Sequence, residues 1–283
     1  MKTLIAITLF TILTQTYAAD SVTAVDSKRH YDIYQMKTEI PEGNFEASIY
    51  LPTTTKIKAM LVLTPTIAGV TIIEKSNAQY FSKAGYLIII PLPYKSEVDS
   101  AKPDIVKLDD EFYKPAFAAD SFIALSETKF KLPVNLPVFA MGASQGGIRT
   151  LIIASHSARI TASWFATAGG DFPAIYARSV VEKIASFRMK HMKVLGITDP
   201  REYEIYLREH LTHDPATACA DIKTPFVQTM TLRDDKVPTA NQELLVKSCP
   251  EHMILTLNTG HVAGSLSTVN WRHKIRRFFE ESL

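Results

Sequence analysis

Residues 138–148 read Val-Phe-Ala-Met-Gly-Ala-Ser-Gln-Gly-Gly-Ile, and they decide the fold of the chain. A short apolar run leads into Gly-x-Ser-x-Gly, and apolar residues then recur at helical spacing from Ile148 onward. This order predicts a strand, a tight turn and a helix, with Ser144 on the turn and its hydroxyl exposed. The small residues Gly142 and Gly146 allow the two backbone segments to cross closely.

The predicted turn has a chemical interpretation. Ser144 is placed to act as a nucleophile, and Gln145 opens the helix, so its backbone N–H can stabilise a developing oxyanion. The positive end of the helix dipole adds to this effect. The motif also arises by chance in a chain with eleven glycines, so the hypothesis depends on finding its partners.

Two such partners follow later predicted strands. Asp234 lies just after a strand at 226–230, and His261 lies just after a strand at 253–257. The chain order serine, aspartate, histidine is the order expected for a nucleophile on a strand-to-helix turn. Each residue falls at the carboxyl end of its strand, where open α/β sheets place their sites. The sequence therefore predicts a catalytic triad of Ser144, His261 and Asp234.

The rest of the chain fits one α/β domain. With 283 residues and 46% hydrophobic content, it can bury a single large core. An antiparallel hairpin followed by strand–helix units predicts a mostly parallel sheet with helices on both faces. The eight predicted strands are 32–40, 45–51, 59–63, 86–90, 138–141, 162–166, 226–230 and 253–257.

Two connections are longer than usual. Residues 91–115 are polar and carry three consecutive acids from Asp109, which we interpret as a solvated loop beside the site. Residues 171–217 carry apolar and aromatic stripes at helical spacing, which predict a small helical cap over the sheet.

With these residues in place, the chain resembles an α/β-hydrolase over nearly all of residues 19–283. The matching pieces are Gly-Ala-Ser-Gln-Gly at 142–146, Asp-Asp-Lys-Val-Pro at 234–238 and Gly-His at 260–261. The second is similar to the family's Asp-x-x-Val-Pro signature and favours Asp234 over its neighbour. The resemblance implies an eight-stranded sheet and hydrolysis of an ester, thioester or amide without a cofactor. The short format resembles small esterases and dienelactone-hydrolase-like members.

One departure concerns the oxyanion hole. Many members of the family have His-Gly after the third strand, where this chain has Thr64-Pro65. Proline has no N–H to donate. The second oxyanion donor, beside Gln145, is therefore expected to be the backbone of Thr66 or of Ile67.

Residues 1–18 have the composition of a cleaved secretory signal. Lys2 precedes an apolar run at 4–13, and Thr16 and Ala18 are small residues at the −3 and −1 places of a cleavage site. The run is too short to span a bilayer, which takes roughly twenty residues. The mature protein would have 283 − 18 = 265 residues, be secreted or periplasmic, and keep no stable membrane anchor.

The chain has two cysteines, Cys219 and Cys249, each shortly before a predicted strand. Behind a secretory signal, such a pair predicts a disulfide rather than two free thiols. The two strands are expected to be parallel neighbours, which places both sulfurs at the edge of the sheet opposite the site. Two buried reduced thiols are the alternative.

Composition excludes some functions and leaves others open. The net charge of +2 with dispersed basic residues gives no basis for nucleic-acid binding. His210 and His213 are too weak a pair to predict zinc, and no cofactor is expected. A small-molecule acyl substrate is the predicted partner. A peptidase or acyltransferase of the same fold, or a binding protein that kept the fold, are the alternatives, and the oligomeric state is left open.

Overall fold

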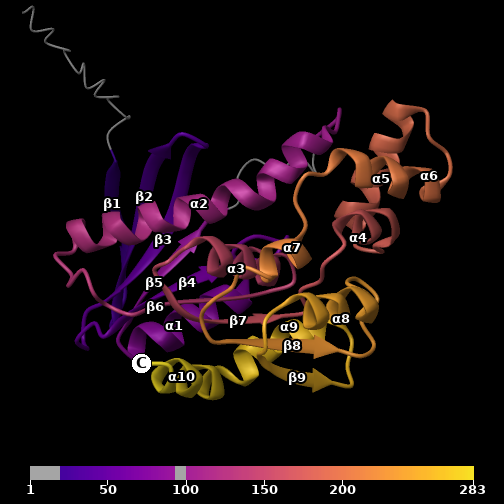
Figure 1. Ribbon diagram of the computed structural model, residues 1–283. Helices are drawn as coiled ribbons and strands as arrows, with labels where there is room; N and C mark the ends of the chain where they lie inside the picture. Colours follow the sequence, from indigo (N-terminus) through magenta and orange to yellow (C-terminus); the bar gives the residue numbers. More distant parts are fainter. Residues whose placement is uncertain (1–19, 93–99) are drawn as a thin grey trace, which may run out of the picture.

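The computed structural model describes residues 20–92 and 100–283, and its centre is a nine-stranded sheet (Figure 1). The strands are β1 (Ser21–Ser27), β2 (Tyr31–Ile40), β3 (Gly43–Pro52), β4 (Ala59–Thr64), β5 (Tyr86–Pro91), β6 (Val138–Ala143), β7 (Ile160–Ala166), β8 (Phe226–Thr231) and β9 (Met253–Leu257). Their order is β1-β2-β3-β5-β4-β6-β7-β8-β9. In this order, neighbouring strands from β1 through β2 and β3 to β5 pair antiparallel. All neighbours from β5 through β4 to β9 pair parallel. This is the predicted mostly parallel α/β architecture.

The sheet has one strand more than the eight predicted, and the additional strand is β1. It pairs with β2 at the edge of the sheet, and almost all of its residues are exposed. Because so little of β1 is buried, its sequence lacks the apolar alternation by which a half-buried strand is recognised. The predicted signal peptide, residues 1–18, lies outside the described residues.

Helices cover both faces of the sheet. They are α1 (Ile72–Lys83), α2 (Ile105–Lys129), α3 (Gln145–His156), α4 (Phe172–Arg178), α5 (Glu182–Leu195), α6 (Pro200–His210), α7 (Pro215–Cys219), α8 (Thr239–Ser248), α9 (His261–Asn270) and α10 (Arg272–Glu281). Helices α1, α9 and α10 pack together on one face, and α2, α3 and α7 lie on the other (Figure 1).

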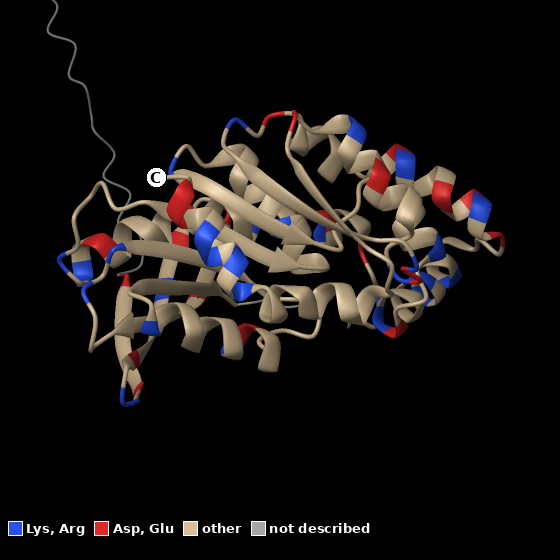
Figure 2. Cartoon of the chain, turned by 90° about the horizontal axis from the view of Figure 1, so that it is seen from below, with Lys and Arg blue, Asp and Glu red and all other residues tan. Residues whose placement is uncertain are grey.

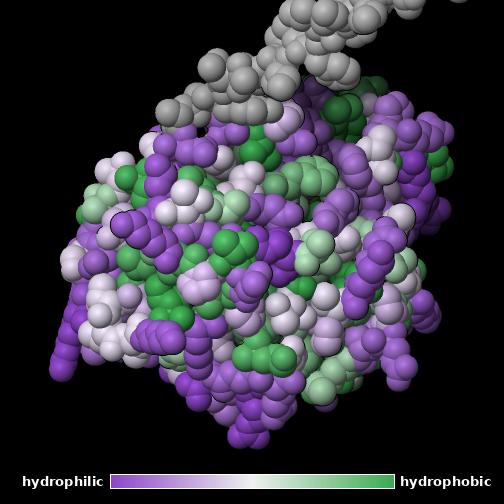
Figure 3. Space-filling model, turned by 60° about the vertical axis from the view of Figure 1, so that its left-hand side comes forward, coloured by the Kyte–Doolittle hydropathy of each residue, from purple (hydrophilic) through white to green (hydrophobic). Residues whose placement is uncertain are grey.

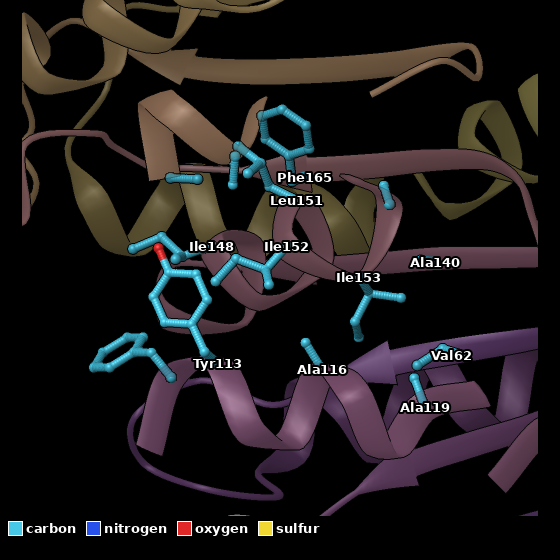
Figure 4. Packing of buried hydrophobic residues seen from close by; sticks show 14 of the residues in the cluster. Val62, Tyr113, Ala116, Ala119, Ala140, Ile148, Leu151, Ile152, Ile153 and Phe165 are labelled. Atoms are coloured by element: carbon cyan, nitrogen blue, oxygen red, sulfur yellow. The ribbon is translucent and has the colours of Figure 1, made fainter. Parts of the chain in front are cut away.

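Successive side chains of each buried strand pack on opposite faces of the sheet, in two separate hydrophobic cores. In β4, Met60 and Val62 join the core under α2 and α3, whereas Leu61 and Leu63 join the core under α1 and α10. The period of two follows from the pleat of a strand. Figure 4 shows the first core, where apolar side chains of α3 face those of α2. The central strands are therefore apolar on both sides, as their continuous apolar runs predicted.

The predicted loop at 91–115 is wrong in its second half, because α2 begins at Ile105. Asp104 caps the helix by accepting the N–H of Val106 at 2.9 Å. Leu108 and Phe112 lie on the buried side of the helix, so their spacing was the available signal. The polar residues between them, and Pro115 inside the helix, hid that spacing.

Asp109 is buried and not solvated, which corrects the interpretation of the acidic run. Its Oδ2 accepts a hydrogen bond from Thr212 Oγ1 at 2.7 Å and lies 2.6 Å from His213 Nδ1. Only 5% of the residue is exposed. The acid therefore joins α2 to the end of the helical segment that follows β7.

That segment contains α4, α5, α6 and α7; α5 and α6 lie at the upper right of Figure 1, with α4 below them, whereas α7 lies beside α3. Glu204 of α6 bonds Arg178 of α4 at 2.8 Å and Arg208 at 2.7 Å, and Arg208 also reaches Asp171 at 2.9 Å. The helices at the right of Figure 2 accordingly carry basic and acidic residues side by side, while the strands are mostly uncharged. This ion-pair network fixes α6 against the first helix of the cap.

The face of the molecule drawn in Figure 3 is neither wholly polar nor wholly apolar. On the face drawn in Figure 3, apolar side chains are exposed in small groups among polar ones. None of the described helices combines the length and the apolar character needed to cross a membrane.

The strand order changes direction at β4. The next strand in the chain, β5, pairs on one side of β4, and β6 pairs on its other side. In open α/β sheets the crevice at such a switch point, beyond the carboxyl ends of the strands, is the usual ligand site. The residues that follow β4 and β6 therefore frame the candidate site.

Candidate active site

Ser144 occupies the sharp turn between β6 and α3. Its φ of 56° is rare for a residue with a side chain, so the turn holds strained backbone. A side chain at Gly142 would overlap Thr64 Oγ1, and one at Gly146 would overlap Thr64 O. Both glycines of the motif are thus required by the close approach of the chain that leaves β4.

The three residues predicted as a triad lie in one line of contacts. Ser144 Oγ is 2.8 Å from His261 Nε2, and His261 Nδ1 is 2.8 Å from Asp234 Oδ2 and 3.0 Å from Oδ1. A carboxylate only accepts hydrogen bonds, so Nδ1 carries the proton and Nε2 is free to accept one from the serine hydroxyl. His261 and Asp234 are both buried, while Ser144 is half-buried.

Asp234 is held by several donors besides the histidine. Its Oδ1 accepts the backbone N–H groups of Lys236 and Val237 at 2.9 Å each, and its Oδ2 accepts Thr231 Oγ1 at 2.8 Å. Burial alone would raise the pKa of Asp234, but the bonds from His261 and the two N–H groups outweigh it and lower that pKa. The carboxylate is therefore kept ionised and fixed in orientation.

The two expected oxyanion donors after β4 differ in the structure. The Thr66 N–H donates to Glu74 Oε1 at 3.1 Å, and Glu74 also accepts from the Thr71 N–H at 2.7 Å. Within the described part of the chain, the Ile67 N–H has no acceptor, and Ile67 lines the same pocket as Ser144 and Gln145. Glu74 is buried in α1, so it secures the loop that presents Ile67.

Thr167 supports the turn from behind and escaped sequence-based prediction. The Ser144 N–H donates to Ala166 O at 2.9 Å and to Thr167 Oγ1 at 3.1 Å. Thr167 Oγ1 is also 3.2 Å from the hydroxyl of Ser265, which lies on the helix that begins at His261. Its φ of 50° is unfavourable for a β-branched residue. One buried hydroxyl thus connects the serine turn with the histidine helix.

The pocket around Ser144 is walled by helices from outside the triad. Phe112 of α2, Phe172 and Tyr176 of α4 and Ile184 of α5 contribute side chains to it. The helical segment after β7 therefore lies against the site.

Metal ligands do not assemble among the described residues, where no group of three or more His, Cys, Asp or Glu could hold an ion. His213 contacts Asp109 instead, and His210 Nδ1 bonds the carbonyl of Tyr206 at 2.8 Å.

Cys219 and Cys249 form the predicted disulfide, with a Cα–Cα distance of 4.9 Å. Cys219 ends α7 before β8, and Cys249 follows α8 before β9. Since β8 and β9 are parallel neighbours, the bond lies at the edge of the sheet opposite Ser144, as the sequence predicted.

The sheet order, the strained serine turn and the cap are those of the α/β-hydrolase fold, which the chain therefore has. Solved structures of this fold match at low sequence identity. An acetyl xylan esterase from a Paenibacillus species is 14% identical, with a TM-score of 0.72 over 93% of this chain and 89% of that one. Acetyl xylan esterase 1 from a Thermoanaerobacterium species is 13% identical, with a TM-score of 0.70 over 93% and 87%.

Acylaminoacyl peptidase from Pyrococcus horikoshii is 16% identical with a TM-score of 0.62, but the match covers 90% of this chain and only 42% of the peptidase. No family model and no curated protein matches the sequence. At these identities the comparisons show the fold, and function must be argued from the site.

Proposed function

We propose that this protein is a serine hydrolase that cleaves an ester or thioester through an acyl-enzyme on Ser144. The observation that carries the proposal is the line from Ser144 Oγ through His261 to Asp234, with both distances at 2.8 Å. A serine hydroxyl is a weak nucleophile and needs an adjacent base, and that base needs a fixed tautomer. Two of the structural neighbours are acetyl xylan esterases, which agrees with this chemistry.

The mechanism assigns each group one role. His261 Nε2 takes the proton of Ser144 as Oγ attacks the carbonyl carbon, and it returns that proton to the leaving group as the tetrahedral intermediate collapses. Water then attacks the acyl-enzyme in the same way and releases the acid. Asp234 holds the imidazole in the required tautomer and stabilises its charged form.

The developing oxyanion would be bound by the N–H groups of Gln145 and Ile67. Each such donor is worth on the order of 10²–10³ in rate. Thr66, the other expected donor, is left out of this mechanism because its N–H already donates to Glu74.

Secretion or export to a periplasm remains part of the proposal. It is supported by the Cys219–Cys249 disulfide, because such bonds persist mainly in oxidising compartments. It also rests on the signal-like residues 1–18.

A fluorophosphonate probe tests the nucleophile. We expect the mature protein to be labelled on the peptide that contains Ser144, and Ser144→Ala to abolish labelling. The same substitution should lower kcat for an ester substrate by on the order of 10⁴-fold or more. Labelling that persists in the alanine variant would reject Ser144.

A panel of p-nitrophenyl esters, thioesters and aminoacyl amides separates an esterase from a peptidase. We expect turnover of esters and thioesters, and little of the amides. Adding a primary alcohol as a competing acceptor distinguishes hydrolysis from acyl transfer by the product that forms.

A further inference from the structure

The pocket beside Ser144 is lined by some residues of the proposed catalytic machinery and not by others. The residues that carry the nucleophile and both proposed oxyanion donors, Ser144, Gln145 and Ile67, line it, whereas His261 does not. A tetrahedral intermediate carries Oγ, the oxyanion, the acyl chain and the leaving group on one carbon. His261 must reach the leaving group to protonate it. The pocket therefore receives the acyl chain, and the leaving group lies on the histidine side.

The pocket is small for a binding site. Its volume is about 30 Å³. Pockets for drug-sized ligands span roughly 300–1,000 Å³. A pocket about a tenth of that size or less suits a short acyl chain, of about two or three carbons.

The walls are not free to move apart. The ring of Phe112 on α2 lies 4.7 Å from that of Phe172 and 6.1 Å from that of Tyr176, both on α4. At most 4% of each of these residues is exposed. Widening the pocket between α2 and α4 would separate edge-on aromatic pairs and expose their rings.

On the histidine side, two residues near the buried triad members reach solvent. Val262, the residue after His261, is 61% exposed, and Leu232, two residues before Asp234, is 48% exposed. We therefore propose that the substrate is an ester or thioester of a short acyl chain, about two or three carbons long, with a leaving group free to be large. This inference rests on the proposed function and adds the size of the acyl group.

A chain-length series tests it on the mature protein. We expect kcat/KM for p-nitrophenyl acetate and propionate to exceed that for the hexanoate and octanoate by at least tenfold. The larger phenol of 4-methylumbelliferyl acetate should change kcat/KM by less than tenfold. Equal or better hydrolysis of the long chains, or loss of the umbelliferyl ester, would overturn the proposal while the hydrolase assignment stands. If no ester is cleaved and Ser144 is not labelled, the proposed function itself fails.

Two substitutions on one helix make the test specific. Ile148 and Ile152 are both buried on α3, but only Ile148 lines the pocket (Figure 4). Ile148→Ala should reduce the acetate-to-hexanoate ratio at least fivefold, and Ile152→Ala should leave it within twofold. The milder Ile148→Val should shift the ratio in the same direction as alanine. An equal effect of Ile148→Ala and Ile152→Ala would show that the pocket does not hold the acyl chain.

Discussion

Asp234 and Asp235 are neighbours in the chain but lie in different surroundings. Asp234 is buried against His261, while Asp235 is exposed. We expect Asp234→Asn to lower kcat by on the order of 10⁴-fold, because an amide no longer enforces the histidine tautomer. Asp235→Asn, the matched control, should retain activity within a few-fold. Steady-state kinetics on both variants decides between them, and equal losses would count against Asp234.

Thr167 is expected to act as a positioning residue for the serine turn. Thr167→Val keeps the branched shape and removes the hydroxyl that joins Ser144 to Ser265. The Ser144 N–H keeps its bond to Ala166, so the fold should lose only about 1 kcal/mol. A small displacement of the nucleophile should nevertheless reduce kcat by roughly 10–100-fold with little change in KM.

The conservative variant separates positioning from packing at this residue. Thr167→Ser retains the hydroxyl and should keep kcat near that of the unmodified protein. If the serine and valine variants were equally impaired, loss of the hydrogen bond would not account for the effect, and the positioning role of the hydroxyl would be rejected.

The place of the candidate site was predictable to the extent that single residues follow strands. Ser144, Asp234 and His261 could be proposed together because each follows an apolar run in a fixed order, and the structure brings their side chains into contact. The hydrogen bond from the Thr66 N–H to Glu74 was not predictable, although Thr71-x-x-Glu74 is a recognisable capping box. The sequence shows that Glu74 caps α1. Only the three-dimensional path of the loop shows that its second oxygen takes the Thr66 N–H.

Among the secondary-structure elements, the buried strands were predictable from the sequence. The exposed strand β1 and the first part of α2 were not. β1 has almost no buried residue and depends on pairing with β2, a contact that no local pattern encodes. In α2, the acidic residues at 109–111 and Pro115 interrupt the apolar periodicity. Both elements are set by the tertiary contacts around them.

The disulfide couples α7 and α8 and makes a prediction about stability. Replacing both Cys219 and Cys249 by alanine opens a loop closed over 30 residues, which should lower the free energy of unfolding by about 3–4 kcal/mol in the chain-entropy model. Urea denaturation of both proteins measures the difference. Esterase activity in the absence of urea should be retained, because the bond lies at the edge opposite Ser144.

Reductant supplies the control for that experiment. Dithiothreitol should shift the denaturation midpoint of the unmodified protein toward that of the double variant and leave the variant unchanged. Two free thiols in the denatured, unreduced protein would contradict the bond.

For the whole molecule, buried histidines set a pH dependence of stability. Burial lowers the pKa of His191, with Asp104 acting in the opposite direction, and burial likewise lowers that of His252. A pKa lower in the folded than in the unfolded state means that the unfolded chain binds protons first as pH falls. The contribution of these histidines to the free energy of unfolding is therefore fully present above pH 6.5, about the pKa of histidine in the unfolded chain, and it is lost as the pH falls below that value.

Chemical denaturation at pH 7.5 and pH 5.5 measures this loss. We expect His191 to account for part of it, because burial lowers its pKa in the folded state. Only 3% of His191 is exposed, and its Nδ1 lies 3.0 Å from Tyr203 Oη. His191→Asn keeps a polar group there without a titratable ring, so the variant should lose less stability between the two pH values. An unchanged difference would show that His191 does not contribute.

The position of α10 has a consequence for how the chain folds during synthesis. Phe279 stacks on Phe139 of β6 at 4.6 Å, and it closes the core formed with Phe81 of α1. A nascent chain that has not yet reached residue 272 lacks the α10 side chains, Ile275 and Phe279, that complete this core. The apolar surface left exposed is a target for chaperones and for aggregation. Synthesis of α10, rather than completion of the serine turn, is thus the step after which this part of the core can be completed.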